Sequence, residues 1–191
     1  AIWNVTNSIF NNNFAAKEGG VYYSGTPVST WSSKNCTYSN NAAVTGETAS
    51  GGAWNAKNSI FWGGNDQFSG TIGTLEYCDV QNDDWNSFTT NYKCIGRDPL
   101  FVSTIEPYNF HMDPSSPCID TAVTAEGVTF DAAGIPRPQG YGVDMGAYEQ
   151  SGMGLPVIRV IQPNGSEKLS FGTTYEVKWQ ISGVVNGDVY V

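Results

Sequence analysis

The chain has 191 residues, enough for one domain and part of a second, with a net charge of −9 and only 14% charged residues. This acidity argues against nucleic acid as a partner, because phosphate contacts need basic clusters, and equally against an anionic membrane surface. The sequence contains no run of about 18 apolar residues, so we expect no membrane insertion.

A four-residue motif recurs in the first third of the chain, as Asn7–Phe10, Asn35–Tyr38 and Asn58–Phe61, at spacings of 28 and 23 residues. Repeats of this length with insertions between them are typical of coiled, stacked architectures, in which each unit buries its apolar face against its neighbours. Alternation around each copy is strand-like, and no helical periodicity competes with it. We therefore expect an all-β stack of parallel coils over residues 1–96.

Parallel stacking about 4.8 Å apart would place like residues over like. On this basis isoleucines such as Ile9 and Ile60 should stack inside. Segment 75–80 is a fourth, degenerate rung with Tyr77 in the asparagine position. The predicted structural ladder at one corner, where each side-chain amide bonds its neighbour's amide or a turn backbone, consists of Asn7, Asn35 and Asn58.

Aromatic residues recur at related places in successive rungs, and four of them are candidate contacts for a carbohydrate or a protein partner: Tyr22, Trp31, Trp54 and Trp62. Trp62 is expected to face outward relative to Ile60. Three roles stay open for these rings, which are stacking on sugars, covering the coil with self-packed loops, and forming a subunit interface.

The four cysteines form no C-x-x-C motif and there is a single histidine, so an ordinary zinc site is not expected. Cys36 and Cys118 are interpreted as buried thiols. Cys78 and Cys94 bracket a polar loop, and either a disulfide between them or two free thiols fits the sequence.

No catalytic residue is predicted, because no acid, base or nucleophile has a suitable partner. His111 is interpreted as structural. Three acids lie close together around a polar loop: Asp79, Asp83 and Asp84. They fit either a weak calcium site, or paired acids beside an aromatic platform, or a solvated turn, and we favour the turn. Calcium is therefore the one possible cofactor that the sequence suggests, and we expect no other.

From Arg97 the pattern changes to a succession of motifs: D-P-L-F-V (98–102), F-H-M-D-P (110–114), S-P-C-I-D (116–120), I-P-R-P (135–138) and V-D-M-G-A-Y-E (143–149). Together with the N-S-I-F repeat they resemble the C-terminal end of bacterial right-handed parallel β-helix surface proteins of the choice-of-anchor type. The resemblance implies that residues 97–152 form an irregular cap over the open end of the coils. It also implies a cap network of Asp120, Arg137, Asp144 and Glu149. Family members usually carry Gly where this chain has Ala122, so that turn is expected to differ.

Residues 153–191 alternate apolar and polar positions between turns, which is typical of an antiparallel sandwich. This segment resembles the start of an Ig-like surface module, with too few strands for a complete sandwich. Because the sequence opens with Ala1 and stops inside a strand-like alternation, we expect it to be part of a longer protein.

These observations favour a non-enzymatic extracellular or cell-surface segment with a structural or adhesive role in a larger bacterial protein. The expected partners are flanking parts of the same protein or identical subunits in a filament. The alternative is a carbohydrate-active enzyme or a polysaccharide-binding module that uses the 79–85 acids and the tryptophans.

Overall fold

A computed structural model describes residues 2–25, 29–83, 85, 88–150, 157–162, 168, 170–172 and 174–182. In these residues the protein is all-β, as predicted, and its single helical element is the short 3-10 turn Gln81–Asp83. Three sheets are entirely parallel, and two strand pairs are antiparallel.

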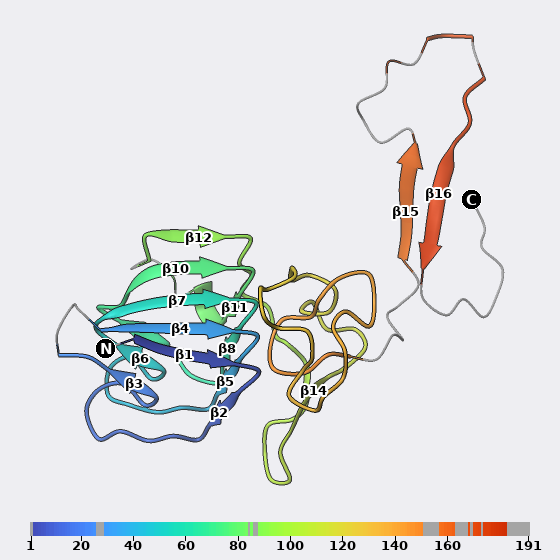
Figure 1. Cartoon of the computed structure of the whole chain (residues 1–191). Helices are drawn as coiled ribbons and strands as arrows, with labels where there is room; N and C mark the ends of the chain where they lie inside the picture. The colour runs from blue at the N-terminus through green and yellow to red at the C-terminus, as the bar shows by residue number, and fades with distance from the viewer. Residues whose placement is uncertain are drawn as a thin grey trace.

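The chain visits the three parallel sheets in turn and returns to each one about one repeat later. The first sheet has the order β1 (Ile2–Thr6), β4 (Thr30–Lys34), β7 (Ala53–Lys57), β10 (Ile72–Glu76) and β12 (Thr90–Tyr92). The second contains β2 (Ile9–Asn11), β5 (Thr37–Ser39), β8 (Ile60–Trp62) and β11 (Asp79–Val80). The third contains β3 (Tyr22–Tyr23), β6 (Ala49–Ser50) and β9 (Phe68–Ser69). We call residues 2–96 the stack; Figure 1 shows the strands of the first sheet lying one above another.

The strands pair in the register that the repeat predicts. Trp3 pairs with Trp31 and Trp31 with Trp54, so equivalent residues of successive turns lie directly above one another. Asn7, Asn35 and Asn58 follow the last paired residues of β1, β4 and β7. The different spacings between repeats are absorbed by the loops, because the strands themselves stay in register.

Stacked aromatic rings fill the interior. Phe10, Tyr38 and Phe61 lie nearly parallel, with ring centroids 5.0 and 4.7 Å apart. Trp54, which is fully buried, contacts Tyr38 and Phe61 edge-on. Such offset and edge-to-face geometries are the favourable ones for aromatic pairs.

Ile60 is fully buried, but it does not lie in the aromatic interior of the stack, where the predicted stacking of isoleucines would place it. In β8 it is Phe61 that belongs to the aromatic core, while Ile60 belongs to a second core made with the C-terminal part of the chain. Trp62 contacts this same second core, so it shares the face of Ile60 rather than opposing it. The left-handed residue Asn58 re-aims the chain before β8, and alternation counted from β7 therefore does not carry over.

Residues 97–150, which we call the lobe, contain few regular elements. The antiparallel strands β13 (Phe101–Ser103) and β14 (Asn109–Met112) form a hairpin with a register shift. Farther along, β15 (Val157–Gln162) and β16 (Lys178–Ser182) pair antiparallel, as the alternation of the sequence predicts. The turn motifs expected between these two strands fall largely outside the described residues.

Candidate functional site: the asparagine ladder and the lobe docked on it

Five turns of the stack pass between the first and second sheets through one residue in the left-handed conformation. These residues are Asn7, Asn35, Asn58, Tyr77 and Lys93, with φ between 46° and 55°. Among residues with a Cβ atom, asparagine adopts this conformation most readily, because its short polar side chain bonds locally. The backbone therefore explains why asparagine recurs here.

The residue after each of these positions is always small and carries a hydroxyl or a thiol. Its side chain donates to the backbone carbonyl two residues earlier, in Ser8, Cys36, Ser59, Cys78 and Cys94, at 2.8, 3.3, 3.0, 3.3 and 3.8 Å. This repeated contact of the serine and cysteine side chains was not predicted from the sequence. The shared signal, Ser or Cys directly after the repeated turn residue, was present in the sequence.

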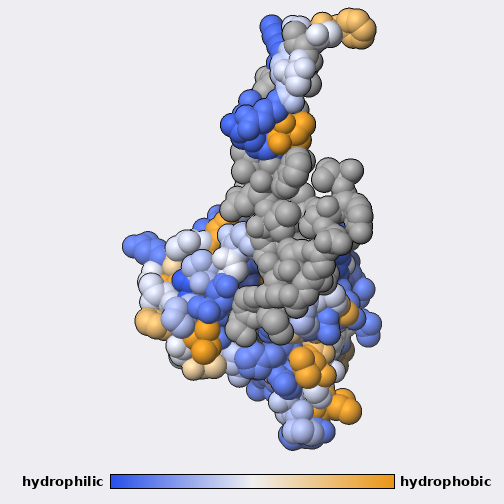
Figure 2. All heavy atoms as spheres, turned by 90° about the vertical axis from the view of Figure 1, so that its right-hand side faces the viewer, coloured by the Kyte–Doolittle hydropathy of each residue, from blue (hydrophilic) through white to orange (hydrophobic). Residues whose placement is uncertain are grey.

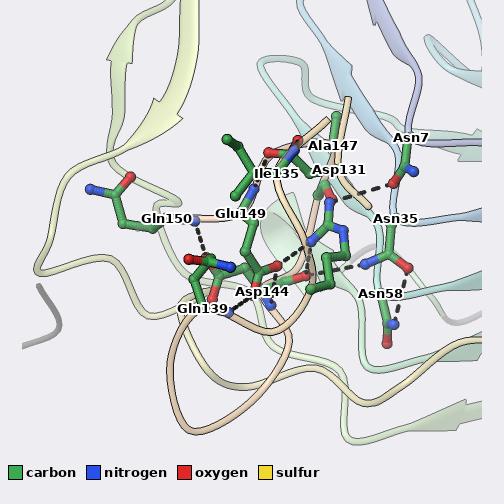
Figure 3. Close-up of polar contacts among 12 residues, drawn as sticks. Asn7, Asn35, Asn58, Asp131, Ile135, Gln139, Asp144, Ala147, Glu149 and Gln150 are labelled. Atoms are coloured by element: carbon green, nitrogen blue, oxygen red, sulfur yellow. Dashed lines mark hydrogen bonds and ion pairs between the residues drawn. The ribbon is translucent and has the colours of Figure 1, made fainter. Parts of the chain in front are cut away.

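The asparagine side chains bind the lobe more than they bind one another. Asn7 donates to the Phe130 carbonyl at 2.5 Å, and Asn35 donates to the Asp144 carbonyl at 3.2 Å. Within the predicted ladder, one amide-to-amide bond is present, from Asn58 Nδ2 to Asn35 Oδ1 at 3.2 Å. Figure 3 shows these three asparagines in a row facing the lobe.

Of the three asparagines, Asn58 forms the most side-chain hydrogen bonds. It is fully buried, donates to the Val123 carbonyl at 2.6 Å, and accepts from the Val123 N–H at 3.3 Å. This pairing satisfies one backbone donor and one acceptor of the lobe with a single side chain.

The lobe contacts the side of the stack, through the asparagines along the first three turns and through Asp79 on the fourth. Besides the asparagines, Gly146 donates its N–H to the Asn58 carbonyl at 2.8 Å, and Ala147 donates to Thr37 Oγ1 at 3.0 Å. The expectation that this segment sits over the open end of the coils is therefore wrong in this respect, because its described contacts run across successive turns. An asparagine side chain projecting from each turn supplies the polar partners that the irregular lobe backbone needs.

Arg137 lies at the centre of the lobe. Its side chain is 1% exposed and pairs with the buried carboxylate of Glu149 at 2.5 Å. It also donates to the carbonyls of Gly146 and Asp144, at 2.9 and 3.3 Å, and to Asn7 Oδ1 at 3.5 Å. One guanidinium therefore joins the lobe to the first turn of the stack, as its planar set of donors permits.

The acids predicted beside Arg137 are brought together, although they act mainly through backbone N–H groups. Asp144 accepts from the N–H groups of Asp120 and Gln150, at 2.8 and 2.6 Å. Asp120, itself left-handed with φ of 56°, accepts from the Gly142 N–H at 2.9 Å. Burial raises the pKa of Asp144 to about 7, and burial also raises the pKa of Glu149.

Asp131 belongs to the same network and was missed by sequence reasoning. Its Oδ1 accepts from the N–H groups of Ala133 and Ile135, both at 2.8 Å, and its Oδ2 accepts from the backbone N–H of Glu149 at 2.9 Å. The signal was local, since Asp followed by a Gly-containing turn commonly bonds the backbone just ahead of it.

Three of the four aromatic candidates cannot contact a sugar or a partner. Tyr22, Trp31 and Trp54 are 7%, 8% and 0% exposed and pack together in the interior of the stack. None of the three roles left open describes these rings, because they lie on strands and fill the core of the stack instead of covering it from loops. They face inward because the apolar interior of each turn can be filled only by side chains of its own strands.

Trp62 is the remaining candidate, and it borders an open hollow of about 730 Å³ between the stack and the β13–β14 hairpin. The hollow is also lined by Asn40, Leu100, Phe101, Asp98 and Asp113. It contains both an aromatic ring and carboxylates, which is a composition compatible with a polar organic ligand.

The acids of the 79–84 segment do not gather into an open site in the described part of the chain. Asp79 is fully buried, where it accepts from the Cys118 thiol at 3.1 Å and from the Arg97 N–H at 3.0 Å. Asp84 and the side chain of Asp83 lie outside the described residues. Among the described residues, no group of three or more His, Cys, Asp or Glu side chains could hold a metal ion.

The remaining predicted residues have structural contacts. The His111 ring stacks on Tyr148 with centroids 4.1 Å apart. All four cysteines are free thiols in the structure, and Cys36, Cys78 and Cys118 are buried, as was expected for Cys36 and Cys118. Burial raises the pKa of each of these three thiols.

Comparisons of the chain with protein-family models, curated proteins and solved structures found no match. Among the described residues, no helix is long and apolar enough to cross a membrane.

Proposed function

We propose that the stack is a right-handed parallel β-helix and that the protein is a non-enzymatic, extracellular structural or adhesive segment of a larger bacterial surface assembly. The fold proposal rests on the three in-register parallel sheets that the chain visits in turn. The cellular location rests on the resemblance of the motifs to surface proteins. The strand pair β15–β16 fits the proposed start of an Ig-like module.

The main support for a structural role is the unpaired edge of β1. Among the described strands, β1 pairs only with β4. Trp3 continues the inward column of Trp31 and Trp54, with its ring 6.4 Å from that of Trp31, yet it is 57% exposed, and Ile2 is 75% exposed. Such an edge, with an unpaired backbone and uncovered apolar side chains, recruits a further strand.

The partner that fits this edge is another parallel turn, from a flanking part of the same protein or from an identical subunit. At the opposite end β12 pairs only with β10 among the described strands and is exposed throughout. Contacts between two different ends do not close on themselves, so identical copies joined in this way would form filaments.

Sedimentation velocity and electron microscopy of the 191-residue chain test end-to-end association. We expect concentration-dependent oligomers that Trp3→Lys weakens by at least about tenfold, since it places a charge on the apolar end face. Val44→Lys is the matched control, because Val44 is 76% exposed but lies outside the strands of the stack. A strictly monomeric particle over the whole concentration range would remove the support for self-assembly.

A polysaccharide-binding module is the second candidate, and the hollow beside Trp62 favours it. Calorimetry against uronic-acid and neutral polysaccharides, with Trp62→Ala and Asp98→Asn as variants and Trp3→Ala as control, tests this candidate. Binding lost only in the two hollow variants would establish it. Turnover abolished by Asp83→Ala and Asp84→Ala would instead identify an enzyme and refute the structural proposal.

A further inference from the structure

Cys78 and Cys94 occupy equivalent positions on neighbouring turns at the end of the stack. Glu76 pairs with Tyr92, and Asp79 forms a parallel bridge with Ile95, so Cys78 and Cys94 stand opposite each other between two paired positions. The backbone holds this alignment closely, because the Ile95 N–H donates to the Cys78 carbonyl at 2.8 Å and the Tyr77 N–H donates to the Tyr92 carbonyl at 2.8 Å.

The two side chains share one environment. Each sulfur lies on the same side of its turn, because both donate to the carbonyl two residues earlier. Cys94 packs against the aromatic core cluster to which Cys78 belongs. Neighbouring parallel strands lie about 4.8 Å apart, a spacing of Cα atoms within the range that a disulfide spans.

Because Cys78 and Cys94 differ in exposure, one of them should react before the other. Cys78 is fully buried, and burial raises the pKa of its thiol, whereas Cys94 is only partly buried. A hydrogen bond with the Cys78 side chain lowers the pKa of Cys94. Cys94 is therefore the thiol that a reagent from solvent meets first and in the more reactive state.

We propose that Cys78 and Cys94 are a stacked dithiol that a small-molecule disulfide oxidises to an intramolecular bridge, fastening the last turn to the rest of the stack. The Cys94 thiolate attacks one sulfur of the oxidant, which forms a mixed disulfide and releases one thiol. The Cys78 sulfur, after losing its proton to solvent, attacks the Cys94 sulfur and releases the second thiol. Two protein thiols are oxidised, and one disulfide is reduced to two thiols.

The element that gains from the bridge is β12. It contributes only three paired residues, all of them exposed, and is the most weakly held strand of the first sheet. A covalent link two residues beyond its end would restrict the segment between Cys78 and Cys94 in the unfolded chain, and would hold β12 against β10 in the folded one.

The test exposes the reduced protein to oxidised glutathione, quenches it in acid, denatures it, and alkylates the remaining thiols with N-ethylmaleimide. We expect two alkylated cysteines, Cys36 and Cys118, and a peptide linked through Cys78 and Cys94. We also expect a higher melting temperature and slower amide exchange in residues 90–92. In the native reduced protein, alkylation of Cys94 should exceed that of Cys36 by at least about tenfold.

The chain supplies matched controls. Serine already occupies the equivalent position in Ser8 and Ser59, so Cys78→Ser and Cys94→Ser should fold, and each should abolish the bridge. The double variant Cys36→Ser, Cys118→Ser should retain it. Four alkylated cysteines after oxidation, a lasting glutathione adduct on Cys94, or a bridge to Cys36 or Cys118 would each overturn the proposal.

Discussion

At the scale of the residue, each left-handed asparagine has two roles, one in the conformation of the turn and one in binding the lobe. The backbone of each turn requires a positive φ, and the amide that tolerates it also reaches the lobe. Glycine would satisfy the first requirement without the second. Alanine would satisfy neither, and this difference allows the two contributions to be measured separately.

Asn58→Ala should destabilise the protein by about 2–4 kcal/mol, the sum of left-handed backbone strain and two unpaired lobe groups. Asn58→Gly should cost about 1 kcal/mol less, because it avoids the left-handed strain and removes only the side-chain hydrogen bonds to Val123 and Asn35. Urea unfolding measures both, with the exposed Asn65→Ala as control. Equal losses in the two Asn58 variants would show that the backbone conformation contributes nothing.

Asp144 predicts a dependence of stability on pH. Its pKa in the folded protein is raised to about 7 from an ordinary value of 3.8, so folding favours the protonated form. The stabilisation is complete below the ordinary value and is lost as the pH rises towards 7, with a slope of at most about 1.4 kcal/mol per pH unit.

Asp144→Asn should remove this part of the pH dependence between about pH 4 and 7. Urea unfolding at several pH values checks it, and exposed Asp98→Asn serves as control. The expectation fails if the wild type and Asp144→Asn curves stay parallel. Glu149, whose pKa is also raised, contributes in the same direction and should leave a residual slope in the variant.

At the scale of the element, the strands of the first sheet are held together by a column of rings as well as by their backbone bonds. Trp31 and Trp54 lie 5.2 Å apart in register, and the column ends at Gly73, where a Cβ atom would lie 2.1 Å from the Trp54 carbonyl oxygen. The same column is buried in the middle of the stack and uncovered at Trp3.

Trp54→Ala should destabilise the protein by about 3–5 kcal/mol, the usual cost of a cavity left by a large buried ring. Trp3 lies at the exposed end of the same column, so Trp3→Ala should lower the free energy of unfolding by less than about 1 kcal/mol. Thermal and urea unfolding compare the two variants. Similar losses of stability in the two variants would mean that the burial of a ring in this column does not govern its contribution to stability.

At the scale of the whole molecule, the lobe and the stack depend on a close approach at Gly146. A Cβ atom there would lie 2.8 Å from Ile60 Cδ1 and 2.9 Å from Thr37 Oγ1, and the residue has φ of +88°. The second core, which contains Ile60, Met112 and Met145, lies at this contact. On the face of the molecule in Figure 2, apolar residues are scattered among polar ones.

Gly146→Ala should release the lobe while the stack stays folded. Amide exchange should rise by at least about tenfold in residues 118–149 and remain slow in β4, β7 and β8. Gly127→Ala is the control, because its φ is +77° but a Cβ atom there meets nothing within 4 Å. Unchanged exchange in the lobe of Gly146→Ala would show that this approach does not hold the two parts together.

The sequence by itself determined the all-β class, the repeat and its register, because a parallel stack aligns every equivalent residue with its copies. It also grouped Asp120, Arg137, Asp144 and Glu149, although through a family resemblance rather than through spacing. Only the tertiary structure decided that Ile60 packs into the buried core shared with the lobe and that the asparagines bind the lobe. Side-chain direction after a left-handed turn, and the place where an irregular segment docks, depend on contacts between residues far apart in the chain, and alternation along one strand carries no information about them.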